Sequence, residues 1–261
     1  MNIGKSKRVI YTSIFGGYDE LVEPEFKPVG WDFVCFTDRD FTSETWEIRK
    51  SIPLYSDNTR NARKHKLLTH RLFPDYDYSL WVDGNIKVRG DINNMLKYLD
   101  NCNYATYDHS QNLLDPRGCI YQEANAIFYG GKKTTEKCQN IINDTATVSG
   151  APFECDCRVN LYKHYKDIPD IIKNQVERYR TEGYPQDNGL VVQMEVLRKH
   201  NESDVIEAME NHWIELKHNS RREQLSFNYI AWKDKLKFSY IPGDSRDNEF
   251  FLNMGTHKGI K

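Results

Sequence analysis

Short apolar runs alternate with helical segments through the first half of the chain, and this order is its most constraining feature. Residues 8–15, 32–37 and 78–82 are rich in β-branched and aromatic side chains, and a glycine or an aspartate follows each run. Residues 58–73 have helical character and are followed by Pro74. This alternation predicts an α/β fold, in which a mostly parallel sheet is flanked by helices on both faces.

The second half of the chain is less regular. Two runs have strand character and four segments have helical character: residues 104–107 and 124–129 for the strands, and about 133–146, 158–181, 203–217 and 220–234 for the helices. Asp91 is a candidate N-cap for one more helix, which would begin at the next residue. No internal repeat or low-complexity linker divides the chain, so a single domain over residues 1–261 is predicted.

Charge and composition argue against several classes of protein. The chain has 36 Lys and Arg against 38 Asp and Glu, and a nucleic-acid partner would require a basic excess. No apolar run approaches the roughly 20 residues of a membrane span, and the start of the sequence lacks a signal-peptide pattern. The 6 cysteines form no CxxC pair, which favours reduced thiols. We therefore expect a cytoplasmic protein, with peripheral attachment to a membrane left open.

Three of the apolar runs end in polar or glycine-rich tips. Residues 16–19 (GGYD) follow the first run, Asp38 follows the second, and residues 83–85 (DGN) follow the third. Ligands of open α/β sheets bind just beyond the carboxyl ends of the strands. If the three strands are parallel neighbours, their tips converge on one cleft.

The third tip has the chemistry of a cation site. Asp83 and Asn85 carry oxygen-bearing side chains on either side of Gly84, and such a pair can face a hard cation such as Mg²⁺ or Mn²⁺. The cation would keep coordination positions open for substrate phosphates. The same tripeptide is also ordinary β-turn chemistry, and taken alone it favours a turn.

The helix before Pro74 carries a basic face. Arg60, Arg63 and Lys64 stand at positions i, i+3 and i+4, so they share one side of the helix. Arginine binds phosphate oxygens as a fork and lysine binds them as a point charge. This face could hold the phosphates or the ribose of a nucleotide, and a solvated basic face is the alternative.

Longer strings of the sequence carry a family resemblance: VIYTSIFGGYDEL, DFVCFTD, RNARKHK, FPDYDYSLWVDGN and RGCIYQEA, followed by LRKHN and SRREQLSFNYIAWK. In this order they resemble a glycosyltransferase-like family once known only as a domain of unknown function. That family includes plant cell-wall and mucilage-related proteins, with bacterial and viral relatives. The resemblance implies a GT-A type (Rossmann-like) fold, with a nucleotide-binding half at about residues 1–100 and an acceptor and donor-sugar half at about residues 101–261.

The resemblance also implies roles for residues near the tips. Asp83 and Asn85 would form a DxD-like metal motif, in which Asn replaces the second acid. Further residues would contact the nucleotide: Thr12, Phe15 and Tyr18 beside it, Asp38 at the base, and Arg60, Arg63 and Lys64 at the ribose and phosphates.

The tail of the chain offers two more candidates. His257 and Lys258 are similar to the C-terminal His and Lys that retaining GT-A enzymes use on the metal and the diphosphate. His257 would be a third metal ligand, and Lys258 would neutralise the leaving group. An exposed histidine without a role is the alternative reading of His257.

Three acids are candidates for catalysis: Glu123, Asp187 and Glu223. Glu123 could bind acceptor hydroxyls or act as a base, and a structural ion pair with Arg117 is the alternative. Glu223, together with Gln224, loosely resembles an Asp-Gln segment that contacts the donor sugar in retaining GT-A enzymes. An acid in the first turn of a helix is the alternative for Glu223.

Together these features predict a metal-dependent glycosyltransferase, which moves a sugar from a nucleotide-diphospho-sugar to a carbohydrate, glycolipid or other hydroxyl acceptor. The family favours UDP as the nucleotide, with GDP open, and the tail favours retention slightly over inversion. Two other classes stay open. One is a nucleotidyltransferase, against which the short Gly16-Gly17 tip without a nearby lysine counts. The other is a non-catalytic module that binds a nucleotide or a sugar.

Overall fold

The computed structural model describes residues 6–128 and 167–255. Its main sheet has seven strands in the order β3-β2-β1-β4-β7-β6-β8. These strands are β1 (Arg8–Ile14), β2 (Trp31–Thr37), β3 (Glu47–Lys50), β4 (Tyr78–Val82), β6 (Tyr104–Asp108), β7 (Val191–Arg198) and β8 (Ser239–Ile241). All pairs are parallel except those of β7, which runs antiparallel to β4 and β6. The predicted α/β fold class, a mostly parallel sheet flanked by helices, is confirmed.

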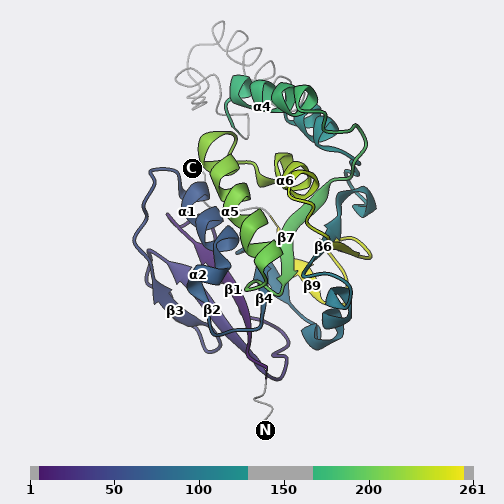
Figure 1. Cartoon of the computed structure of the whole chain (residues 1–261). Helices are drawn as coiled ribbons and strands as arrows, with labels where there is room; N and C mark the ends of the chain where they lie inside the picture. Colours follow the sequence, from purple (N-terminus) through teal and green to yellow (C-terminus); the bar gives the residue numbers. More distant parts are fainter. Residues whose placement is uncertain (1–5, 129–166, 256–261) are drawn as a thin grey trace, which may run out of the picture.

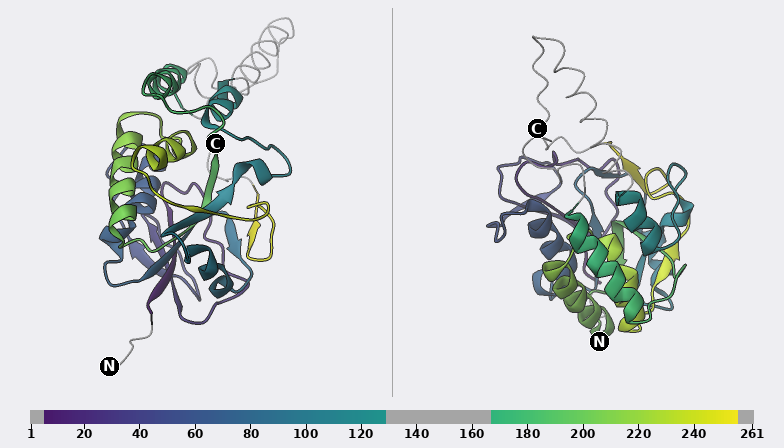
Figure 2. Two further views of the ribbon diagram at one scale, coloured as in Figure 1. Left: turned by 45° about the vertical axis from the view of Figure 1, so that its right-hand side comes forward. Right: turned by 90° about the horizontal axis from the view of Figure 1, so that it is seen from above.

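Helices and a small second sheet cover the two faces of the main sheet (Figures 1 and 2). One face carries α1 (Asn58–Leu67), α2 (Thr69–Leu72), α5 (Ser203–His218) and α6 (Phe227–Lys233), with α4 (Pro169–Thr181) beyond α6. The other face carries η1 (Ile92–Leu99) and the pair β5 (Ile86–Val88) and β9 (Phe251–Asn253). The short helix η2 (His109–Gln111) follows β6, and the short helix η4 (Glu223–Leu225) precedes α6. Among the described residues, no helix is both long and apolar enough to cross a bilayer.

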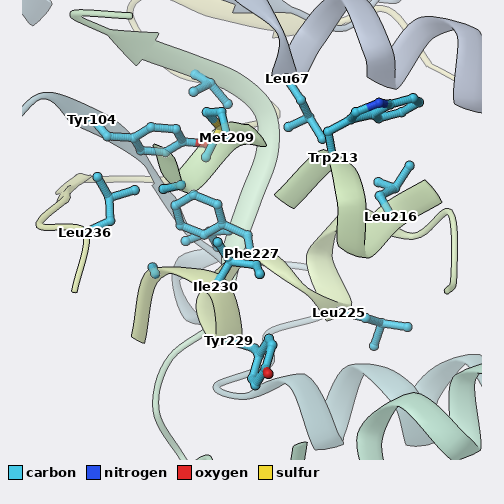
Figure 3. Packing of buried hydrophobic residues seen from close by; sticks show 14 of the residues in the cluster. Leu67, Tyr104, Met209, Trp213, Leu216, Leu225, Phe227, Tyr229, Ile230 and Leu236 are labelled. Carbon is cyan, nitrogen blue, oxygen red and sulfur yellow. The ribbon is translucent and has the colours of Figure 1, made fainter. Parts of the chain in front are cut away.

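The core has two parts because successive side chains of a strand point to opposite faces of the sheet. Val9 and Tyr11 of β1 join the cluster under α1, α5 and α6, whereas Ile10 joins the cluster under η1 and the small sheet. Figure 3 shows the first cluster, in which the ring of Tyr104 stacks on Phe227 of α6 with 4.7 Å between centroids. Strands buried on both faces read as continuous apolar runs, which is why the sequence identified them.

Most predicted elements of the first half are confirmed. The strands at residues 8–15, 32–37 and 78–82 correspond to β1, β2 and β4. The single helix predicted at residues 58–73 is interrupted at Leu68, the boundary between α1 and α2. Asp91 is the predicted N-cap, since its side chain accepts a hydrogen bond from the backbone N–H of Asn93, although the helix that follows is a 3₁₀ helix.

The second half departs more from prediction. Residues 120–128 are helical, so the strand predicted at residues 124–129 is wrong; a short buried apolar run does not distinguish a strand from a buried helix. The helix predicted at 203–217 is confirmed as α5, and the one at 220–234 divides into η4 and α6. The helix predicted at 133–146, and the first part of the one at 158–181, lie outside the described residues.

The small sheet depends on a close backbone approach at Gly90. A Cβ added to Gly90 would lie 2.2 Å from the carbonyl oxygen of Glu249, just before β9. We expect Gly90→Ala to lower the free energy of unfolding by about 1–3 kcal/mol, because the backbone before β9 must move away. Urea unfolding measures this change.

The control for this prediction is Gly118→Ala. The nearest atom to an added Cβ there is Oε1 of Gln122 at 3.8 Å, an ordinary contact. Its free energy of unfolding should stay within about 0.5 kcal/mol of the parent. Equal losses in the two variants would contradict the role of Gly90.

Candidate functional site

The tips of β1, β2 and β4 meet at one edge of the sheet. The backbone N–H of Gly16 donates to both carboxylate oxygens of Asp38, at 3.1 and 3.2 Å, and so links the first tip to the second. Asp19 lies against the third tip, since its Oδ2 would be 3.0 Å from a Cβ added to Gly84. The predicted convergence of the three tips is therefore confirmed.

The glycines of the first tip are required by its backbone. Gly16 and Gly17 have φ of 65° and 68°, in the left-handed region that side chains disfavour. A Cβ on Gly16 would also lie 1.9 Å from the side-chain nitrogen of Asn58, the first residue of α1. These two glycines let the chain turn tightly after β1, where it lies against the first residue of α1.

Four charged side chains form a group at the end of β4, which we call the charged cluster: Asp83, Arg63, Lys66 and Glu223. Lys66 Nζ donates to Glu223 Oε1 at 2.7 Å and lies 3.5 Å from Asp83 Oδ1. Arg63 lies 3.2 Å from the same oxygen of Glu223 and 3.5 Å from Asp83 Oδ1. The indole N–H of Trp81 also donates to Asp83 Oδ1, at 2.7 Å, and this bond orients the carboxylate.

Burial and ion pairing act in opposite directions within the charged cluster. The side chain of Lys66 is 0% exposed, that of Glu223 is 5% exposed and that of Asp83 is 17% exposed. Burial lowers the pKa of Lys66, while the negative charges of Asp83 and Glu223 raise it. Asp83 is therefore the acid of the cluster with more contact with solvent, and it occupies the end of β4.

Tyr18 lies within electrostatic reach of the charged cluster. Burial raises the pKa of its hydroxyl, and the charges of Asp19 and Asp83 add to this rise, while Arg63 opposes it. Tyr18 is half-buried and lies near the charged cluster. Its contact with a nucleotide stays a prediction.

Asn85 connects the third tip to the C-terminal part of the chain. Its Nδ2 donates to the carbonyl oxygen of Gly255 at 2.7 Å, and its own carbonyl oxygen accepts from the N–H of Met254 at 2.9 Å. Its side-chain Oδ1 is buried and has no hydrogen-bond partner among residues 6–128 and 167–255. His257 and Lys258 follow closely in sequence, but both lie outside the described residues.

The donor atoms at this tip fit a hard cation. Carboxylate and amide oxygens suit Mg²⁺ or Mn²⁺, which retain several positions for water or phosphate and need few protein ligands. Asp83 supplies one such oxygen, and the unpaired Oδ1 of Asn85 is a second. Within residues 6–128 and 167–255, no group of three His, Cys, Asp or Glu could hold a metal, so a full protein cage is not present there.

Two residues predicted beside the nucleotide belong to the core instead. Thr12 is buried within β1, on the face covered by η1 and the small sheet. The ring of Phe15 is buried and lies 5.2 Å from the ring of His65 under α1. Their burial keeps both side chains from a ligand at the rim in this structure.

The basic face of α1 is divided between two tasks. The guanidinium of Arg60 donates to the carbonyl oxygens of Leu216 and Asn219, so it joins α1 to the end of α5 rather than facing the cleft. Lys64 is partly exposed on α1, and its contact with phosphate stays a prediction. Lys66 was missed, although it stands three residues after Arg63 and so shares its side of the helix.

Glu123 is buried and ion-paired with two arginines, so its carboxylate is not exposed to solvent. Its Oε2 lies 2.6 Å from Arg117 Nε, and its Oε1 accepts from Arg222 Nε at 2.7 Å. Burial opposes its ionisation, but Arg222 and Arg117 together lower the pKa of this carboxyl. The ion-pair alternative is confirmed, and the pair helps to hold the segment that leads into Glu223.

The other two acids lie in different places. Glu223 belongs to the charged cluster and is also the first residue of η4, which bears out the alternative of an acid in the first turn of a helix. Its contact with a donor sugar stays a prediction. Asp187 is exposed in the loop before β7, with a left-handed φ of 55°, and it lines a separate cavity beside α6.

Part of the chain is similar to a known protein family. Residues 37–146 match the family described as TOD1/MUCI70, glycosyltransferase-like domain. The chain is also 53% identical over 34 residues to a probable hexosyltransferase, MUCI70, of Arabidopsis thaliana. That match spans 13% of this chain and 6% of the relative's length.

Two solved structures are distantly similar. One is a glycosyltransferase involved in glycosylation of the major capsid of PBCV-1, with a TM-score of 0.42 and 10% identity over 96% of this chain and 94% of that one. The other is the apo structure of the bifunctional glycosyltransferase WbbM, with a TM-score of 0.41 and 12% identity over 93% of this chain and 39% of that one.

The chain is an α/β protein, and part of it is similar to a glycosyltransferase-like domain. Residues 37–146 match the TOD1/MUCI70 glycosyltransferase-like domain, and this match confirms the predicted resemblance for that stretch. The stretch contains Asp83 and Asn85 as well as Arg63 and Lys66 of α1.

Removal of one charge from the charged cluster should destabilise the protein, because each charge of the cluster is compensated by the others. We expect Lys66→Met to lower the free energy of unfolding by about 3–5 kcal/mol, because it leaves Glu223 buried with Arg63 as its remaining cation. Adding Glu223→Gln should recover part of that loss, with an interaction energy of about 0.5–3 kcal/mol. Urea unfolding of the double-mutant cycle measures both values.

The matched control is Lys173→Met, an exposed lysine of α4. It should change stability by less than about 0.5 kcal/mol. Strictly additive effects of the Lys66 and Glu223 substitutions would contradict the coupling.

The Glu123 ion pair should appear in the pH dependence of stability. Because the folded state lowers the pKa of this carboxyl, its contribution is present above the unfolded value of about 4.3 and is lost as pH falls through the folded value. We expect Glu123→Gln to be less stable than the parent at neutral pH, with the difference shrinking on acidification. Glu177→Gln, at an exposed position of α4, is the control. A difference that stayed constant with pH would show that ionisation of Glu123 is not its source.

Proposed function

We propose that this chain is a metal-dependent glycosyltransferase. It transfers a sugar from a nucleotide-diphospho-sugar, with UDP favoured over GDP, to a hydroxyl of a carbohydrate or glycolipid. The main support is the position of Asp83. It stands at the carboxyl edge of a mostly parallel sheet, faces buried cations, and lies inside the stretch that matches a glycosyltransferase-like domain.

In this proposal Asp83 and Asn85 hold Mn²⁺ or Mg²⁺. The unpaired buried Oδ1 of Asn85 supports this role, because a buried polar atom without a partner costs free energy unless a ligand compensates it. The bound cation would supply charge stabilisation for the departing diphosphate. His257 would add a ligand and Lys258 a second positive charge at that diphosphate.

The charged cluster would position the donor. Lys66 and Trp81 orient the carboxylate of Asp83 from the protein interior. The buried ammonium of Lys66 lies 3.5 Å from Asp83 Oδ1, and the indole of Trp81 donates to the same oxygen. Arg63 is 21% exposed and stands beside Tyr18, so its guanidinium is the cation of the cluster that can reach a phosphate oxygen.

Glu223 would contact the donor sugar. Its Oε1 accepts from Lys66, whereas its buried Oε2 has no hydrogen-bond partner in the part of the chain that the structure describes. A sugar hydroxyl could donate to that oxygen. This position supports the likeness to the Asp-Gln segment of retaining enzymes, and retention therefore remains the slightly favoured outcome.

A nucleotidyltransferase fits the first tip less well. Such an enzyme needs backbone N–H groups that cradle phosphates beside a lysine. Here the N–H of Gly16 donates to the carboxylate of Asp38, so an acid occupies the place of a phosphate. Asp38 in turn remains the candidate that reads the nucleotide base.

The test combines binding and turnover. With UDP in excess, Mn²⁺ should raise the melting temperature of the protein, because a ligand at about 100 times its Kd stabilises by about 2.7 kcal/mol. Asp83→Asn should abolish that metal-dependent shift and lower turnover of UDP-sugars by about a hundredfold or more. Asp170→Asn, an exposed position of α4, is the matched control and should behave as the parent.

Three results would contradict the proposal. Binding of UDP that ignores Mn²⁺ would remove the metal role. Binding without release of UDP from any donor would leave a non-catalytic module, and full turnover by Asp83→Asn would remove Asp83 from the site.

A further inference from the structure

A cavity of about 590 Å³ lies between α6, the loop before β7 and the edge strand β8. We call it the α6 pocket. Aromatic side chains form part of its wall. Trp232 and Tyr240 are 38% and 37% exposed, and the ring of Phe238 stands edge-on to Tyr240 with 5.4 Å between centroids. Half-exposed rings in a concavity offer flat apolar faces to a ligand.

The backbone around the α6 pocket is strained. Among the described non-glycine residues, only Asp187 and Lys235 have a positive φ, at 55° and 57°, and both line this cavity. Gly189, with a φ of 80°, lines it as well. Left-handed conformations of non-glycine residues cost free energy and are concentrated at ligand sites and turns. Their coincidence in one cavity is a second observation that points to a binding site.

Polar groups complete the wall. Asp187 presents an exposed carboxylate from the loop before β7, and Asp108 brings a second carboxylate from the end of β6. Asn228 also lines the cavity, and its side-chain Oδ1 accepts a hydrogen bond from the N–H of Val191. The two carboxylates outnumber the one cation, Lys235, so the pocket repels an anionic ligand.

We propose that the α6 pocket binds a neutral pyranoside and that this sugar is the acceptor. Its C–H face lies on Trp232 and Tyr240, and its hydroxyl groups donate to Asp187 and Asp108. A pyranose has an apolar face and a rim of hydroxyl donors, which matches rings beside carboxylates. The acceptor role, though not the binding, rests on the proposed function.

One strand connects the α6 pocket to the charged cluster. The N–H of Val191 donates to Asn228, and its carbonyl oxygen accepts from Gln224, the neighbour of Glu223. Two residues further along β7, the carbonyl oxygen of Gln193 accepts from Lys66. Two residues of a strand span about 7 Å. The wall of the α6 pocket and the charged cluster are therefore joined to the same short stretch of β7, which supports an acceptor in this pocket.

The experiment measures binding of methyl pyranosides of glucose, galactose, mannose and xylose to the full chain by saturation-transfer NMR. We expect at least one to bind, and Trp232→Ala and Asp187→Asn each to weaken it by about tenfold. Trp232→Phe keeps a stacking face and should retain most of the affinity. Phe26→Ala, an exposed ring elsewhere, and Asp170→Asn are controls that should bind as the parent does.

The outcomes separate this inference from the proposed function. Failure of all four sugars to bind, equal affinity of the Trp232 and Asp187 variants with the parent, or tighter binding of methyl glucuronide would overturn it. Because Asp187 is exposed, Asp187→Asn remains informative if Trp232→Ala does not fold. The UDP and Mn²⁺ melting shift is measured on the same samples. Pyranoside binding without that shift supports the pocket and counts against the enzyme, and a shift without pyranoside binding does the reverse.

Discussion

The buried ammonium of Lys66 is the constraint on which the candidate site depends. A charge removed from water is costly unless opposite charges and hydrogen bonds compensate it. Here the compensating groups come from separate parts of the chain: Asp83 after β4, Glu223 at the start of η4, and the carbonyl oxygen of Gln193 on β7. Helix α1 cannot move relative to these three elements without exposing or isolating that charge. The same interaction that holds the sheet and helices together therefore also fixes the orientation of Asp83.

Among the described residues, this arrangement leaves two oxygen atoms of the site without hydrogen-bond partners. They are Oδ1 of Asn85 and Oε2 of Glu223, and both are buried. Most buried polar atoms of folded proteins are satisfied, so these two atoms support the ligand contacts of the proposed function. The proposed cation and donor sugar would each satisfy one of them. The α6 pocket adds a third place, where strain and half-exposed rings replace charge as the indication.

Much of the fold could be predicted from the sequence because the strands that carry it are local signals. β1, β2 and β4 are buried on both faces, and each is followed directly by a polar tip, so the runs and their ends were visible. β7 was not among the predicted strands. It follows a loop with two left-handed residues, Asp187 and Gly189, and it carries buried Gln193, Glu195 and Arg198 among its apolar residues, which obscures a strand pattern. The strand predicted at residues 124–129 was wrong for another reason. Residues 120–128 form a helix, and a short apolar run suits a helix as well as a strand.

The sequence by itself determined the class of fold, the polar tips and the identity of Asp83 and Asn85, since each depends on residues that are neighbours along the chain. Only the tertiary structure decided which charges meet. It directed Arg60 towards α5 and Lys66 towards Asp83, and it enclosed Glu123 between two arginines. It also brought Trp232 and Tyr240 to the cavity that contains Asp187. The physical reason is that burial and ion pairing depend on the distance between elements far apart in sequence, which no local pattern encodes.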